Sequence, residues 1–399
     1  MKNRRVTLFL LLVVVLALVS GSPLLVRLAY ALLFLLLLGY FWAWSNVRRL
    51  EGQVQIITQH PQVGGWLEER LWLRNLGWLP KLLLEVRYSS DLPGHQNGRV
   101  VSLLPGGSSS WTVRTQCQMR GLYAFGPPLV VADDVFGLFS REWPLGKAQN
   151  ILVYPATLEL ANFLLPSGDA PGEGAHRRPT QRVTPNASGI REYIFGDSVN
   201  RIHWRSTAHT GRLMVKEFEL EPSGEIWVIL DLYGPTQAGT GPESTEEYGV
   251  TIAASIVRKY LEANYSVGLM VSGDRGFFFP AQKGRYHQWR ILEALAMVRA
   301  QGGTPVAELI AREGEKFGSN TTVVIITPSA QEVMAAPLHR FLQRRADVVT
   351  IVLDASTFGD QGRPVSAMDG LVSQGVETYL VRQGDDIGSA LDSRIGGLR

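Results

Sequence analysis

Cysteine is almost absent from this sequence of 399 residues, in which Cys117 is the single one. One thiol cannot form a disulfide within the chain, so the fold does not rest on a disulfide framework. Zinc sites built from several cysteines are excluded for the same reason. The composition fits a reducing compartment.

The sequence also has no large excess of positive or negative charge. Charged residues make up 19% of the chain, and 39 Lys and Arg against 36 Asp and Glu give a net charge of +3. So small an excess does not indicate a nucleic-acid partner. Hydrophobic residues make up 45% of the chain, which is enough for folded cores. At roughly 100–200 residues per domain, the length predicts two or three domains.

Catalytic and cofactor motifs are missing as well. The sequence has neither a Gly-x-x-x-x-Gly-Lys-Ser/Thr phosphate loop nor a Gly-x-Ser-x-Gly nucleophile elbow. Neighbouring carboxylates such as Asp133 and Asp134 do not define a catalytic pair, because adjacency in sequence is not geometry. We therefore predict a protein that is not an enzyme and carries no cofactor.

Two long apolar runs lie at the N-terminus, at residues 6–20 and 24–44, with the turn triplet Gly21-Ser22-Pro23 between them. A membrane-spanning helix needs about 20 apolar residues, so we predict a transmembrane helical hairpin over residues 1–49. A cleaved signal peptide that ends near Gly21 is the alternative. The second apolar run, which follows at once, favours the hairpin.

The residues that flank the hairpin predict its orientation. Lys2, Arg4 and Arg5 precede the first run, and Arg48 and Arg49 follow the second. Positive charge stays on the cytoplasmic side of a membrane. We therefore expect a multi-pass protein of the cytoplasmic (inner) membrane, with its soluble domains in the cytoplasm.

The remaining chain divides by its local pattern. Residues 50–155 carry short Val-, Leu-, Trp- and Tyr-rich stretches between Gly, Pro and Asn turns, which predicts an all-β, sandwich-like domain. Residues 156–225 combine a Gly- and Pro-rich linker with a polar segment. Residues 226–399 alternate apolar strands (226–232, 266–271, 321–327, 348–353 and 376–380) with amphipathic helices (243–264, 286–300 and 331–345). That alternation predicts a doubly wound α/β domain.

The polar segment carries an ordered signature: Arg191-Glu192-Tyr193, Gly196-Asp197, Arg201, Trp204-Arg205, Thr210-Gly211-Arg212 and Lys216-Glu217. It resembles the signature of the domain-of-unknown-function 58 (DUF58) family, which runs Arg-Glu-Tyr, Gly-Asp, Ile-Asp-Trp-Lys, Thr-Gly and Leu-Met-Val-Lys-Glu-Phe-Glu. Further upstream, Arg120-Gly121-Leu122-Tyr123 and a Phe-Gly-Leu-Phe stretch after Asp134 resemble the same family. The sequence departs from the family pattern at His203, where the family has Asp, and at His209, where it has Arg.

The resemblance implies that residues 226–399 form a von Willebrand factor A-like domain. Such domains often hold Mg²⁺ through Asp-x-Ser-x-Ser after the first strand, because a hard cation takes oxygen ligands. Here Asp231 keeps the carboxylate, but Tyr233 and Pro235 replace the two serines, and Thr327-Pro328 stands where such domains have a distant Thr and an Asp. Asp231 is therefore a degenerate metal-site position, and we predict no metal there.

The signature residues have two interpretations each. In the first interpretation His203 and His209 are metal ligands or a pH switch. In the second, which we favour, they are surface or capping residues. The basic residues either face an anion or partner, or pair with Glu192, Asp197 and Glu217. Trp204, Tyr193 and Phe218 are predicted core anchors, because aromatic side chains usually are. Gly196-Asp197 and Thr210-Gly211 are predicted turns.

Function follows from the resemblance. Relatives are linked with MoxR-type AAA+ ATPases, which implies a non-enzymatic, membrane-anchored scaffold or adaptor in complex assembly or remodelling. The alternative is an envelope-associated hydrolase or transferase that uses the signature as its site. An enzyme predicts that Arg191, Asp197, Trp204 and Lys216 converge on a cavity. A scaffold predicts an exposed, partner-sized surface on the C-terminal edge of the sheet, with the same four residues packed between domains.

Overall fold

The computed structural model describes residues 4–95, 98–134, 136–166, 183–194, 197, 199, 202–220, 224–272, 276–313, 317, 321–334, 346–359 and 368–395. The chain forms two compact units, Met1–Tyr154 and Pro155–Arg399. Most of the predicted linker, residues 167–182, lies outside the described residues.

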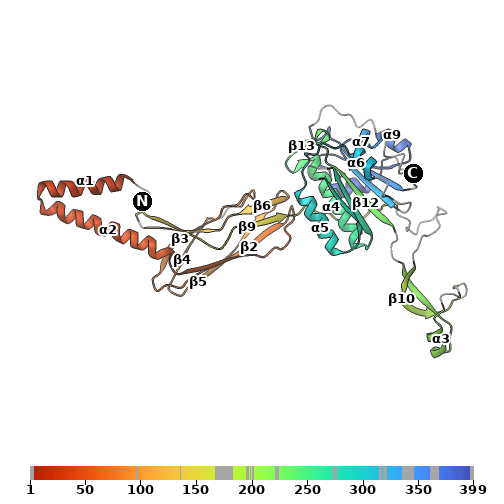
Figure 1. Cartoon of the computed structure of the whole chain (residues 1–399), viewed down its shortest axis with the longest axis horizontal. Coiled ribbons are helices and arrows are strands. Elements are labelled where there is room, and N and C mark those ends of the chain that lie inside the picture. Colours follow the sequence, from red (N-terminus) through yellow and green to blue (C-terminus); the bar gives the residue numbers. More distant parts are fainter. Residues whose placement is uncertain are drawn as a thin grey trace. The chain divides into compact units, whose positions relative to one another are not determined.

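Two packed helices open the first unit: α1 (Arg4–Ser20) and α2 (Pro23–Val47) (Figure 1). Pro23 occupies the start of α2, where its missing N–H costs no helical hydrogen bond. α2 is long and apolar enough to cross a membrane, whereas α1 is apolar over the shorter stretch Leu11–Ser20. The sequence-based prediction of apolar N-terminal helices is therefore confirmed for α2.

The rest of the first unit consists of antiparallel sheets, as the turn-punctuated pattern predicted. One sheet orders β1 (Leu50–Ile56), β2 (Trp66–Asn75) and β5 (Ser108–Gln116). A second orders β4 (Gly98–Leu103), β3 (Lys81–Arg87), β7 (Leu129–Asp133) and β8 (Ser140–Pro144). β6 (Gly121–Phe125) pairs with β9 (Gln149–Val153). Side chains alternate along β2, so Leu67, Leu71 and Leu73 are buried in the core.

A six-stranded sheet forms the centre of the second unit, in the order β16-β15-β12-β17-β18-β19. Its strands are β12 (Glu225–Asp231), β15 (Ser266–Ser272), β16 (Phe277–Gln282), β17 (Thr321–Thr327), β18 (Asp347–Leu353) and β19 (Glu377–Val381). All neighbours are parallel except β15 and β16. The central strands are continuously apolar because both faces of a parallel sheet are covered. The sequence patterns indicated five of these strands but not the antiparallel edge strand β16.

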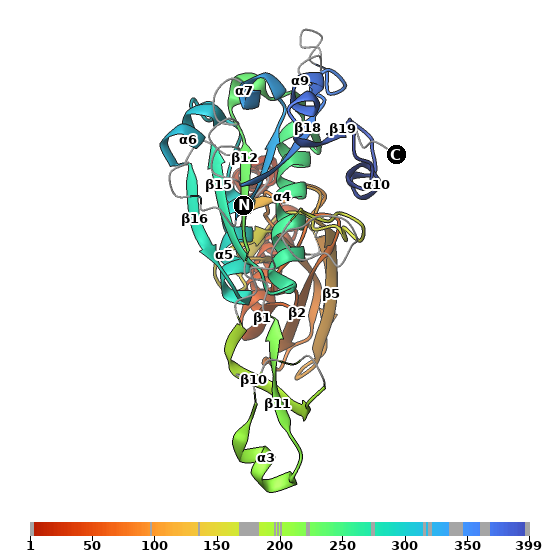
Figure 2. The ribbon, with the colours of Figure 1, turned by 90° about the vertical axis from the view of Figure 1, so that its right-hand side faces the viewer.

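Helices cover both faces of this sheet (Figure 2). On one face, α4 (Thr245–Glu262) packs over the central strands and against α5 (Arg285–Met297). On the other, α6 (Val306–Glu313), α7 (Ala330–Met334) and α9 (Met368–Ser373) share an apolar cluster with Trp227 and Ile229. α10 (Ile387–Asp392) packs on β19, and Asp386 caps its first turn. Of the predicted helix 331–345, the structure describes only the part within α7.

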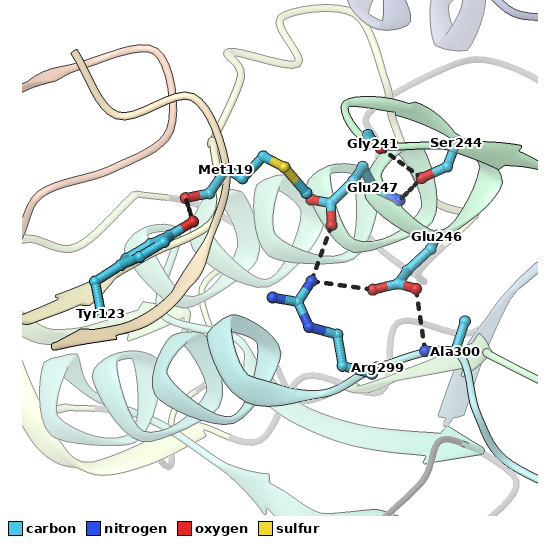
Figure 3. Close-up of polar contacts among 8 residues, drawn as sticks. All are labelled: Met119, Tyr123, Gly241, Ser244, Glu246, Glu247, Arg299 and Ala300. Atoms are coloured by element: carbon cyan, nitrogen blue, oxygen red, sulfur yellow. Dashed lines mark hydrogen bonds and ion pairs between the residues drawn. The ribbon is translucent and has the colours of Figure 1, made fainter. Parts of the chain in front are cut away.

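Polar contacts hold the N-terminus of α4 at the carboxyl edge of the sheet (Figure 3). It is preceded by a 3-10 turn, Gly234–Thr236, and by the short strands β13 (Gly239–Thr240) and β14 (Glu243–Ser244). Ser244 caps the helix by accepting the amide of Glu247 at 3.3 Å. Arg299 bridges Glu246 and Glu247 at 3.4 and 3.5 Å, and Glu246 also accepts the amide of Ala300. These acidic residues are thus part of the helix end itself.

Candidate functional site

The signature segment folds as a hairpin with a helix at its end. β10 (Val183–Glu192) pairs antiparallel with β11 (Met214–Leu220), with Ile190 opposite Lys216 and Arg191 opposite Val215. α3 (Trp204–Thr210) belongs to the connection between the two strands and lies at the tip of the hairpin (Figure 2). Within the described residues, β10 and β11 pair with each other and with no strand of the six-stranded sheet. We call residues 183–220 the signature hairpin.

Local hydrogen bonds define both ends of α3. His203 is its N-cap: Nδ1 accepts the amide of Ser206 at 3.2 Å and lies 2.8 Å from the Ser206 hydroxyl. Because Nδ1 accepts, the ring proton in this state lies on Nε2. At the other end, Gly211 takes a left-handed conformation with φ 70°, which favours glycine, and donates its N–H to Thr207. The capping interpretation of His203 and the predicted turn at Thr210-Gly211 are both confirmed.

Ion pairs within the hairpin connect its turn to its strands. Arg191 and Asp197 form a two-pronged pair with both nitrogen–oxygen distances at 2.7 Å, and Asp197 also accepts the amide of Ile194 at 2.8 Å. Arg212 and Glu192 lie 2.7 Å apart and are largely exposed. These contacts match the interpretation in which signature charges pair with one another. Exposed pairs of this kind add little stability, up to about 1 kcal/mol.

Trp204 corrects the predicted role of the signature aromatics. Its side chain is 64% exposed, and no residue of α3 is buried. Only Ile202 and Val215 are buried among the described hairpin side chains. A two-stranded hairpin with one seven-residue helix has no second layer to cover an indole. Tyr193 is half-buried, and the side chain of Phe218 lies outside the described residues.

Other apolar side chains on the hairpin are exposed as well. Ile194 is 64% and Leu213 45% exposed. They lie on adjoining backbone segments, because the amide of Tyr193 donates a hydrogen bond to the Leu213 carbonyl. Arg205, His209 and Arg212 are exposed beside them. We use the name hairpin surface for six of the exposed residues: Ile194, Trp204, Arg205, His209, Arg212 and Leu213. Exposed aromatic and aliphatic groups with arginine are typical of interaction sites.

The predicted convergence on a cavity is absent from the described hairpin. The depression on α3 is lined by His203, Arg205, Ser206, Ala208, His209 and Thr210. Arg191, Asp197, Trp204 and Lys216 do not line it, and neither does any described carboxylate. Lys216 is half-buried on β11, and Glu217 follows it on that strand, with its side chain outside the described residues. Gly196 and Arg201 also lie outside the described residues.

Asp231, the degenerate metal-site position, ends β12 and is 1% exposed. Its Oδ2 accepts the Thr327 hydroxyl at 2.7 Å, and its Oδ1 accepts the Ser272 hydroxyl at 3.2 Å and the Tyr233 amide at 3.0 Å. Burial raises the pKa of Asp231, and these hydrogen bonds act in the opposite direction. The described residues hold no cluster of three or more His, Cys, Asp or Glu that could bind a metal. Sequence reasoning placed Thr327 near Asp231 but missed Ser272.

The upstream motifs have structural roles. Asp134 accepts the amides of Leu138 and Phe139 at 2.6 and 2.7 Å, so it closes the turn that follows β7. Arg120 is fully buried. The Tyr123 hydroxyl donates to the Met119 carbonyl at 2.9 Å (Figure 3). These residues organise the β-domain and form no catalytic arrangement among the described side chains.

Comparison with known proteins agrees with the signature. Residues 189–357 match the family described as "Protein of unknown function DUF58", so the chain contains a DUF58 domain. "Uncharacterized protein YeaD" of Bacillus subtilis is 24% identical over 216 residues, which cover 54% of this chain and 52% of that protein. "Uncharacterized protein Rv1480" of Mycobacterium tuberculosis is 28% identical over 115 residues, 28% of this chain and 36% of that protein. The chain thus spans about half of the first relative and about a third of the second.

Likeness to solved structures is low. The CARDB domain of PF1109 from Pyrococcus furiosus aligns over 26% of this chain and 92% of that domain, at 17% identity and a TM-score of 0.20. The alkylpurine DNA glycosylase AlkC of Pseudomonas fluorescens aligns over 33% of this chain and 42% of that chain, at 18% identity and a TM-score of 0.18. At such scores neither likeness bears on fold or function.

Proposed function

We propose that this protein is a non-enzymatic, membrane-anchored scaffold or adaptor that works with a MoxR-type AAA+ ATPase in the assembly or remodelling of complexes. In this proposal the two N-terminal helices both span the cytoplasmic membrane, and the soluble domains lie in the cytoplasm. The signature hairpin supplies the docking surface for the ATPase.

The exposure of Trp204 is the observation that carries this proposal. Trp204 is 64% exposed on a short helix, next to Arg205, and the same hairpin also exposes Ile194 and Leu213. Several exposed apolar side chains on one small element are typical of an interaction site. Trp and Arg dominate the energetics of protein interfaces because they combine apolar area with hydrogen bonding. The ion pairs of Arg191 and Arg212 hold the hairpin in shape and leave Arg205 available for a partner.

The topology of the second unit supports a von Willebrand factor A-like domain. The parallel strands run outward from β12 in both directions, in the doubly wound manner, and β16 adds an antiparallel edge. Asp231 lies at the carboxyl edge of the sheet, where open α/β sheets bind ligands. Its oxygens accept protein donors there, so we propose a domain of this type that uses its surface without a metal.

The lengths of the N-terminal helices support two spans. α2 has 25 residues, and α1, with 17, is at the short limit for crossing a bilayer. Gly21 and Ser22 make the connection between them very short. Basic residues at both outer ends favour the arrangement in which those ends are cytoplasmic.

Co-purification from membranes tests the docking proposal. The tagged full-length protein is extracted in mild detergent with and without a non-hydrolysable ATP analogue, and bound proteins are identified by mass spectrometry. We expect an AAA+ ATPase of the MoxR type to be retained with nucleotide. Arg205→Glu and Trp204→Ala should each reduce its recovery at least tenfold, which corresponds to about 1.4 kcal/mol in binding free energy.

Arg312→Glu is the matched control. Arg312 is an exposed arginine on α6, outside the hairpin, so its charge reversal should leave recovery unchanged. Purification without any ATPase under both conditions contradicts the proposal. Recovery that falls equally with the Arg312 variant shows a general charge effect and contradicts the assignment to the hairpin.

A further inference from the structure

A carboxyl group interrupts the core of the β-domain. Glu69 lies on the inward-facing side of β2, between Leu67 and Leu71, and is 1% exposed. Leu71 belongs to one apolar cluster and Leu67 to another, and Tyr88 packs against both clusters. Glutamate is almost never fully buried unless it is paired, so this position calls for a reason.

A cavity of about 260 Å³ adjoins Glu69. Its inner wall includes Tyr88 and the buried side chains of Phe125 and Ile151, while the exposed residues Lys147 and Gln149 lie at its rim. The cavity is therefore apolar and aromatic inside, carries one acid, and is reached from solvent. Small-molecule sites have this character: apolar walls with a few polar groups that fix orientation.

Neither oxygen of Glu69 has a hydrogen-bond partner among the described residues. The nearby phenol of Tyr88 acts to lower the pKa of Glu69, but burial outweighs this influence and raises that pKa to about 7. Buried side-chain acceptors in native proteins are nearly always satisfied, by protein, water or ligand. Because Glu69 lines the cavity, the hydrogen-bond donors for its two oxygens have to come from a molecule inside the cavity.

We propose that this cavity binds a small primary ammonium ion, with Glu69 as its carboxylate partner and the rings of Tyr88 and Phe125 beside it. A primary ammonium carries the positive charge that a buried carboxylate requires and N–H donors for both of its oxygens. Aromatic rings attract cations through their faces. A metal ion fits less well, because hard cations take six or more oxygen ligands and Glu69 is the one carboxylate among the described lining residues.

Ligand-observed saturation-transfer NMR on the full-length protein in detergent micelles tests this site. The probe is n-butylammonium at pH 8, where Glu69 is mostly ionised. We expect saturable binding to the wild-type protein, at least tenfold weaker binding to Glu69→Gln, and weaker binding of tetramethylammonium, which has the charge but no N–H donor. Glu68→Gln is the matched control, because Glu68 neighbours Glu69 on β2 but faces the other way and pairs with Arg114 at 2.8 Å.

Three results decide against the proposal. Equal binding to wild type and Glu69→Gln, or no saturable binding to wild type, shows that the cavity is not an ammonium site. Binding that appears only in Lys147→Ala shows that the protein's own lysine occupies the acid. A thermal unfolding midpoint of Glu69→Gln at or above that of the wild type excludes misfolding as the cause of lost binding.

Discussion

Glu69 and Asp231 are both buried carboxyl groups, and they differ in how the fold satisfies them. Asp231 accepts hydrogen bonds from Thr327, Ser272 and the amide of Tyr233. Glu69 accepts none from the described residues. A buried, unsatisfied acid weakens the folded state in its charged form, because desolvation disfavours that form. Asp231 therefore supports the sheet edge, whereas Glu69 has a cost to stability that varies with pH.

The pH dependence of stability tests this statement at Glu69. Its pKa rises from 4.5 to about 7 on folding, so the folded state binds more protons between these values. Stability therefore falls as pH rises through this window and levels off above it. The neutral variant Glu69→Gln should exceed the stability of the wild type by less than about 1 kcal/mol at pH 5 and by more at pH 8. The gain is at most about 3 kcal/mol, since a factor of ten in proton affinity corresponds to about 1.4 kcal/mol.

Thermal or denaturant unfolding of ligand-free protein at pH 5 and pH 8 measures the difference. Glu68→Gln provides the background, because Glu68 is partly exposed and paired with Arg114. The interpretation is wrong if the gap between wild type and Glu69→Gln is the same at both pH values.

Among the elements, the signature hairpin depends on few contacts. Its strands pair with each other, its buried apolar side chains are Ile202 and Val215 within the described part, and a double hydrogen bond joins Arg191 to Asp197. Two-stranded hairpins are marginal in isolation. Each polar contact in it should therefore matter locally without affecting the six-stranded sheet.

Asp197→Ala should open the hairpin and leave the α/β sheet intact. The substitution removes the acceptor for Arg191 and for the amide of Ile194, which together contribute roughly 1–2 kcal/mol at this partly exposed position. Hydrogen exchange should quicken about tenfold at the amides of β11 and stay unchanged in β17. Asp386→Ala, which removes a cap on α10, is the comparison and should leave the hairpin protected. Faster exchange in β17 with Asp197→Ala would show that the hairpin is integral to the sheet.

For the whole molecule, membrane orientation is the property that the proposed function most depends on. A cytoplasmic ATPase can reach the hairpin only if the soluble units lie on the cytoplasmic side. The alternative of a cleaved signal peptide would put them on the opposite side. A labelling experiment separates these two arrangements.

Because the chain has a single cysteine, background labelling in this experiment is low. Cys117 is buried, and burial raises the pKa of its thiol, so it should react poorly in the folded protein. A new thiol at the exposed position Ser108, as Ser108→Cys, should react with a membrane-impermeant maleimide in inverted vesicles but not in intact spheroplasts. Labelling in intact spheroplasts contradicts the cytoplasmic orientation. The wild-type protein should stay unlabelled in both preparations.

The sequence by itself determined many of the elements, including five strands of the six-stranded sheet. Residues 321–327 read as a buried strand because every side chain is apolar or a small threonine, and they form β17. The same reasoning indicated the capping role of His203 and the turn at Gly211, because these depend on contacts within a few residues. An apolar N-terminal helix and a DUF58 domain also followed directly from residue order.

Only the tertiary structure decided which side chains are covered. Trp204 was expected in a core, yet it is 64% exposed, and a linear pattern cannot show which side chains the fold leaves uncovered. Glu69 alternates in step with Leu67 and Leu71 along β2, so the sequence pattern already indicated that its side chain faces inward. The cavity beside it is formed by strands that are distant in sequence, and only the structure shows it. Ser272 meets Asp231 because parallel register aligns β12 with β15. Local preference acts over a few residues, whereas burial depends on which distant segments pack together.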